Sequence, residues 1–217
     1  MRKIVITIAR QYGSGGKRVG NMLSEQLNIP LYSRDILRKA SEDSGINETL
    51  FNQVDERLKG SPLLRIMRRE YKGELLQPDS DDFLSNQNLF NYQAKVIKAL
   101  AEESSCIFIG RCADYILRDK PYVVSVFIHA SREYCRKMAI ERGAQSTREI
   151  DRFIAQTDKG RADYYHFYTG QEWSNARNYD LCLNSEKLGF DGCCEAIRAY
   201  IGIRFGADWL TVEEEQQ

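Results

Sequence analysis

The sequence predicts an α/β fold in which a mainly parallel sheet is covered by helices on both faces. Short apolar runs rich in β-branched residues recur along the chain, and longer amphipathic segments separate them. This alternation is typical of a doubly wound parallel sheet. The first run, residues 4–9, passes directly into a glycine-rich turn and then into residues at helical spacing. With 217 residues, we expect one domain, or one domain with an inserted lid.

The glycine-rich turn is the stretch that bears most directly on function. Gly13, Gly15 and Gly16 follow the first strand, and Lys17 closes the turn. Glycine reaches positive φ at little cost and has no side chain to keep backbone N–H groups from a ligand. Such amides at a helix N-terminus, together with a lysine, form an anion site, and the usual anion is a nucleotide phosphate. The alternative is a plain turn that binds nothing.

The match of this turn to the Walker pattern G-x-x-x-x-G-K-[ST] is incomplete. Gln11 stands where the first glycine belongs, and Arg18 stands where the hydroxyl residue belongs. That hydroxyl normally ligates magnesium. Ser14 lies inside the loop and is therefore the candidate metal ligand.

The composition excludes several classes of function. Lys plus Arg and Asp plus Glu number 31 each, which argues against a protein that mainly coats nucleic acid or an anionic membrane. The six cysteines form no C-x-x-C pair, so we expect reduced thiols, no zinc and a cytoplasmic location. The start, Met1 to Lys3, leads into a strand and does not resemble a signal peptide. With only two histidines, catalysis centred on histidine is disfavoured.

The remaining elements follow in order along the chain. Ser33 is expected to cap a helix that Gly45 ends, and a long helix is expected over residues 82–103. Further helices are expected to begin after Ser131 and at Thr147. The expected strands cover residues 31–32, 106–109, 122–128 and 179–183, and the closing helix covers 190–205.

Two segments beyond the sheet are candidates for covering a substrate. Residues 60–82 carry the basic run Arg65, Arg68, Arg69 and Lys72 on a helical pattern. They suit either a mobile segment that faces phosphate or a solvated basic helix face. Residues 158–165 combine dense charge with tyrosines, which suits a solvated helix or a lid that folds basic groups over a polyphosphate.

Arg111 is a candidate ligand residue because of its place in the pattern. It directly follows Gly110 at the end of the strand 106–109. The carboxyl ends of parallel strands line the crevice in which α/β sheets bind ligands. We therefore expect ligand contact; the alternative is a surface ion pair with Asp114.

With these motifs in place, the chain resembles the cytidylate kinase-like family, within the P-loop nucleoside monophosphate kinase superfamily. The resemblance covers residues 3–203. It rests on ARQYGSGGKRVG (9–20), PLYSRDIL (30–37), IFIGRCADYIL (107–117), the segment 158–165 and NYDLCLNS (178–185). It implies a P-loop NTPase-type three-layer sandwich with a helical lid. The implied regions are a kinase-like domain 1–205 with an acceptor-side helical segment 46–104 and a lid 144–176, and an acidic tail 206–217.

The resemblance also implies site residues. ATP, with magnesium, would donate its γ-phosphoryl group to a nucleoside monophosphate, CMP or dCMP by analogy. The donor phosphates would be held by Gly13, Ser14, Gly15, Gly16, Lys17 and Arg18. The acceptor would face Ser33, Arg34, Asp35 and Arg111. Lys159 and Arg161 would close from the lid, and Lys17, Arg111, Arg161 and Lys159 would form the catalytic set.

Three functions stay open at this point. Cys112 stands where true cytidylate kinases have an acidic residue, so the acceptor could instead be another small metabolite. A hydroxyl acceptor would need a carboxylate base, for which Asp35 is the candidate. The incomplete Walker pattern also suits a nucleotide-binding or regulatory module without catalysis. The expected partner is a small nucleotide, and a homo-oligomer is left open.

Overall fold

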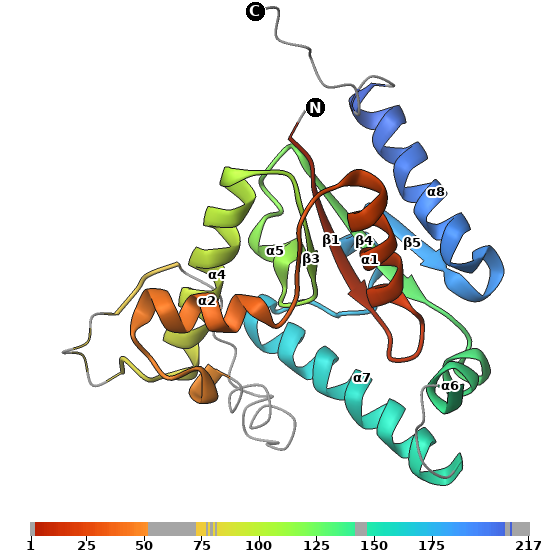
Figure 1. The fold of residues 1–217 in the computed structure, drawn as a ribbon. Coiled ribbons are helices and arrows are strands. Elements are labelled where there is room, and N and C mark those ends of the chain that lie inside the picture. The colour runs from red at the N-terminus through yellow and green to blue at the C-terminus, as the bar shows by residue number, and fades with distance from the viewer. Residues whose placement is uncertain are drawn as a thin grey trace, which may run out of the picture.

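A five-stranded parallel sheet lies at the centre of the molecule (Figure 1). The computed structural model describes residues 3–51, 73–76, 78, 80, 82–141, 147–206 and 209. The strands are β1 (Val5–Arg10), β2 (Leu31–Tyr32), β3 (Cys106–Ile109), β4 (Val123–His129) and β5 (Leu181–Asn184). Their order is β2-β3-β1-β4-β5, and every neighbouring pair is parallel. The predicted α/β fold class is confirmed.

Helices connect the strands and cover the sheet. They are α1 (Gly16–Leu27), α2 (Asp35–Ser44), α4 (Asn86–Glu103), α5 (Ala113–Ile116), α6 (Arg132–Glu141), α7 (Thr147–Thr169) and α8 (Ser185–Phe205), with a 3-10 turn at Ala176–Asn178. The long helix α7 crosses the carboxyl edge of the sheet (Figure 1). Since the strands are parallel, all the loops that leave their carboxyl ends gather at this edge.

The side-chain alternation of β1 divides the interior into two cores. Ile6 and Ile8 pack with α1 and α8 on one face of the sheet. Val5 and Ala9 pack on the other face with α2, α4, α5 and α7. A strand buried on both faces needs apolar residues at consecutive positions, which is why residues 4–9 form an almost unbroken apolar run.

Local details differ from the sequence-based expectations at three places. The residue that caps α2 is Arg34, so the expected capping role of Ser33 is wrong. The closing helix starts five residues earlier than expected, at Ser185, and is kinked at Gly189, whose φ is +68°. The single turn α5 was not expected, because four residues carry no readable helical period.

Some of the predicted features cannot be compared with the fold. The basic run 65–72 and nearly all of the acidic tail 206–217 lie outside the described residues. In the part of the chain that the structure describes, no helix has the length and apolar character needed to cross a membrane.

Candidate functional site

The glycine loop, residues 11–15, joins β1 to α1 in a conformation that requires glycine. Gly13 and Gly15 have φ values of +81° and +79°. A Cβ atom on Gly13 would lie 2.4 Å from the backbone carbonyl oxygen of Cys135. A Cβ atom on Gly15 would lie 2.2 Å from Cε1 of Phe190. Both positions therefore exclude a side chain on steric as well as conformational grounds.

Hydrogen bonds from two serines hold the glycine loop. The Ser14 hydroxyl lies within 2.9 Å of the carbonyl oxygen of Gln11 and 3.0 Å of that of Ile128, both placed to accept its proton. The Ser185 hydroxyl donates to the carbonyl oxygen of Ser14 at 2.7 Å. Ser14 has no exposed surface. Its hydroxyl therefore closes the loop internally, and this geometry does not support the expected role of Ser14 as a magnesium ligand.

The first turn of α1 presents two cations to solvent. Lys17 and Arg18 are both exposed, whereas Gly16 beside them is buried. The Arg18 guanidinium carbon lies 4.6 Å from the ring centroid of Phe190. Because the same ring contacts Gly15, it holds the Arg18 side chain alongside the glycine loop.

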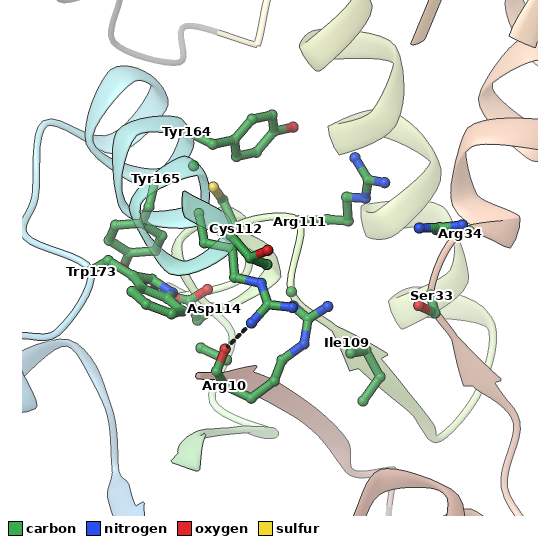
Figure 2. A pocket seen from close by; sticks show the side chains of 15 residues that line it. Arg10, Ser33, Arg34, Ile109, Arg111, Cys112, Asp114, Tyr164, Tyr165 and Trp173 are labelled. Carbon is green, nitrogen blue, oxygen red and sulfur yellow. Dashed lines mark hydrogen bonds between the residues drawn. The ribbon is translucent and has the colours of Figure 1, made fainter. Parts of the chain in front are cut away.

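A cavity of about 530 Å³ opens beside the glycine loop at the carboxyl edge of the sheet. Four arginines from four separate parts of the chain line it: Arg10, Arg34, Arg111 and Arg161. Figure 2 shows the aromatic residues Tyr164, Tyr165 and Trp173 on the opposite side from Arg34 and Ser33, with Arg10 and Arg111 between. The cavity thus has a cationic side and an aromatic side.

Arg10 is a cavity residue that the sequence analysis did not identify. It is the last residue of β1, and its backbone and side chain both take part in the site. Burial and the neighbouring guanidinium groups of Arg161 and Arg111 lower the pKa of Arg10 from its ordinary value. Because buried cations repel one another, a bound anion would offset this repulsion, which indicates an anion-binding site. Its place at the carboxyl end of a buried apolar run, comparable to that of Arg111, was the available signal.

Arg111 enters the cavity from a strained turn. Gly110, Arg111 and Cys112 have consecutive positive φ values of +71°, +62° and +54°. Non-glycine residues avoid this region, and they cluster there mainly at functional sites. A Cβ atom on Gly110 would lie 2.3 Å from Nη1 of Arg10, so the turn lets the Arg10 side chain pass close to the backbone.

Asp158 and Arg161 join α7 to the glycine loop. The backbone N–H of Tyr12 donates to Oδ1 of Asp158 at 2.7 Å. Nη1 of Arg161 donates to the same oxygen and to the carbonyl oxygen of Arg10, both at 3.0 Å. The bonds to Tyr12 and Arg10 span 146 and 151 positions of the sequence and fix one turn of α7 against the end of β1. Asp158 was not singled out as a site residue.

Asp114, the alternative partner considered for Arg111, is buried in the wall of the cavity and does not lie at the surface. The Tyr165 hydroxyl donates to Oδ2 of Asp114 at 2.7 Å. Burial raises the pKa of Asp114 to about 6, against the opposing effect of this hydrogen bond. A carboxyl group of this kind can donate or accept a proton near neutral pH.

The other expected site residues divide into two groups. Ser33 and Arg34 line the cavity. Asp35, in the first turn of α2, and Lys159 are not among the lining residues. Lys159 instead pairs with Asp163 at 2.9 Å, one turn along the outer side of α7. The structure therefore does not bring Lys159 to the cavity.

The side chains around the glycine loop do not fit a magnesium ion held by the protein. Arg18 and the buried Val19, the two residues after Lys17, have no hydroxyl group. β3, one of the two strands that pair with β1, leads into Gly110 and Arg111 and not into a carboxylate residue that could hold the metal. Among the described residues, no three His, Cys, Asp or Glu side chains are grouped to hold a metal.

A glycine loop at the end of the central strand, beside an arginine-lined cavity, defines the fold and site of a P-loop kinase-like protein. The chain belongs to the cytidylate kinase-like family, whose model matches residues 5–187. This confirms the resemblance inferred from the sequence motifs.

The solved structures that are similar to this chain include the following two. An uncharacterized protein from Eubacterium ventriosum ATCC 27560 has 28% sequence identity and a TM-score of 0.67, with 92% of this chain and 98% of that chain covered. Shikimate kinase from Bacteroides thetaiotaomicron has 11% identity and a TM-score of 0.52, with 92% and 99% covered, and it supports the fold alone. No curated protein sequence matches this chain.

Proposed function

We propose that this protein transfers the γ-phosphoryl group of ATP to a nucleoside monophosphate, with CMP or dCMP as the acceptor by analogy. Membership of a kinase-like family supports phosphoryl transfer as the class of reaction. The observation that carries the proposal is the convergence of four arginines on one cavity next to the glycine loop. The donor and the acceptor phosphate would then meet at the end of β1.

The proposed roles follow from position. The amides of the glycine loop and Lys17 hold the donor phosphates, since they lie at the N-terminus of α1. Arg111 and Arg10 bind the acceptor phosphate, and Arg161 stabilises the charge on the phosphoryl group in transfer. Phosphoryl transfer depends mainly on such positioning and charge. A phosphate acceptor is ionised at neutral pH, so no general base is required.

The aromatic side of the cavity supports an acceptor with a planar ring. Tyr164, Tyr165 and Trp173 offer ring faces and edges opposite the arginines, the arrangement that a nucleobase attached to a phosphate would need. Asp114 lies on this side and can read a donor on the ring edge. Cys112, in place of an acidic residue, leaves the choice of base to experiment.

The test is a panel of nucleoside monophosphates and other small acceptors with ATP, with product separated by chromatography. We expect turnover with a monophosphate in the wild type and none in Lys17→Ala, while Lys17→Arg keeps part of it. Turnover only with a hydroxyl acceptor would support a metabolite kinase. ATP binding without product from any acceptor would support a regulatory module.

A further inference from the structure

The first turn of α1 carries a cation where kinases with this loop carry a magnesium ligand. Magnesium prefers hard oxygen ligands, and in P-loop proteins a hydroxyl of this turn supplies one. Here the hydroxyl of Ser14 is buried and directed at two carbonyl oxygens, and Arg18 and Val19 have none. Neither Ser14 nor the two residues after Lys17 therefore offers a hydroxyl oxygen to a metal.

Asp158 contacts the glycine loop, but its surroundings also disfavour a metal. Its Oδ1 atom accepts hydrogen bonds from the Tyr12 backbone and from Arg161. Burial raises the pKa of Asp158, which disfavours its charged form. Both hydrogen bonds use Oδ1, and the adjacent Arg161 guanidinium group would repel a metal cation brought to the other carboxylate oxygen.

The charges that are present suit a bare polyphosphate. Lys17 and Arg18 stand exposed on the first turn of α1, and Arg161 is fixed by hydrogen bonds at the other end of the loop. Phe190 keeps the Arg18 guanidinium next to Gly15. The loop is thus bounded by protein cations on both sides.

We propose that this site binds nucleotide through its own cations, with no ligand for Mg²⁺ among the residues that the structure describes, so that free ATP binds at least as tightly as magnesium-bound ATP. This inference rests on the proposed function, since it concerns the same phosphate site. Magnesium reduces the negative charge of ATP. A site that offers the metal no oxygen gains nothing from it and loses attraction to Lys17, Arg18 and Arg161. The position of Arg18 sets this preference.

The experiment measures ATP binding to the full chain by isothermal titration calorimetry, with EDTA or with excess MgCl₂ at matched ionic strength. For the wild type we expect Kd with EDTA to be equal to that with magnesium or up to about tenfold lower, a difference of at most about 1.4 kcal/mol. Arg18→Thr places a hydroxyl at this position, so this variant should bind ATP more tightly with magnesium than with EDTA. The matched control, Arg18→Ala, removes the cation without adding a ligand and should bind more weakly in both buffers, with no preference for magnesium.

The outcomes separate this inference from the proposed function. Wild-type binding that is reproducibly tighter with magnesium than with EDTA would overturn the inference and leave the kinase assignment standing. An Arg18→Ala variant that acquires the same magnesium preference as Arg18→Thr would also overturn the role given to Arg18. If ATP did not bind in either buffer, both the proposed function and this inference would be wrong. Unfolding temperatures without ligand check that each variant is folded.

Discussion

Three glycine-to-alanine substitutions test whether the glycine loop has the described conformation. Gly45, at the end of α2, has a φ of +71°, and a Cβ atom there would have no neighbour within 4 Å, so this position measures backbone strain alone. Gly15 has similar strain and a side-chain obstacle, the Phe190 ring. Gly13 has similar strain and a backbone obstacle, the Cys135 carbonyl group. The three positions thus differ mainly in what the added methyl group meets.

The expected losses in the free energy of unfolding follow this order. Left-handed backbone costs an alanine about 1–2 kcal/mol, so Gly45→Ala should lose about 1 kcal/mol. Displacing the Phe190 ring adds about 1–3 kcal/mol for Gly15→Ala, as for other overpacked sites. Gly13→Ala should cost more than Gly15→Ala, because a helix backbone cannot rotate out of the way. In a domain of this size, each kcal/mol lowers Tm by about 2–4 °C.

Thermal and urea unfolding of the three variants measure these losses, and ATP titration measures the effect on the loop. Gly45→Ala should bind ATP as the wild type does, whereas the other two should bind it weakly. The double variant Gly15→Ala/Phe190→Ala should lose less than the sum of its single changes, by about 1 kcal/mol, because the second change removes the obstacle. If Gly13→Ala were as mild as Gly45→Ala, the packing of α6 against the loop would be refuted.

Three further predictions concern the cavity. Arg10→Met should weaken acceptor binding by about tenfold or more, as expected for the loss of a charge-assisted hydrogen bond, and calorimetry measures this loss. In thermal unfolding without ligand, the Tm should stay unchanged or rise, because the variant relieves the repulsion from Arg161 and Arg111. Because the pKa of Asp114 is raised to about 6 in the fold, the folded state retains its proton longer, so stability should fall by up to about 3 kcal/mol as pH rises from about 4 to 6. This pH dependence should be missing from Asp114→Asn in urea unfolding at each pH. Asp158→Asn should lower kcat more than it raises KM for ATP, because it weakens the hydrogen bonding that holds Arg161. If the variant had the kcat and KM of the wild type, Asp158 would have no role in the site.

The fold could be predicted because its signals are local. Each expected strand lies within two residues of an observed one, since a strand buried on both faces leaves a continuous apolar run. The glycine turn and the strand-end position of Arg111 were equally readable. The turn α5 and the early start of α8 were missed, because a single helical turn and a kink at Gly189 break the period on which the prediction depends.

The site was only partly predictable because its remaining contacts are distant in sequence. The hydrogen bond from Tyr12 to Asp158 joins residues 146 positions apart, and no local sequence pattern predicts a contact at that separation. Lys159 is the opposite case. Its partner Asp163 lies four residues on, a spacing that predicts an ion pair along a helix surface. The structure contains this local ion pair.

The carboxyl end of β1 carries parts of both halves of the site. Its last residue contributes a guanidinium group to the cavity and a carbonyl oxygen to Arg161, and the next residues are the glycine loop itself. Neighbouring strands on both sides hold β1 in register. In the proposed reaction, one rigid segment would then set the distance between the donor and acceptor phosphates, and substitutions elsewhere in the chain would not alter this distance. Substitutions in α2 or α7 could therefore change which acceptor is preferred without changing the relative position of the phosphoryl donor and acceptor.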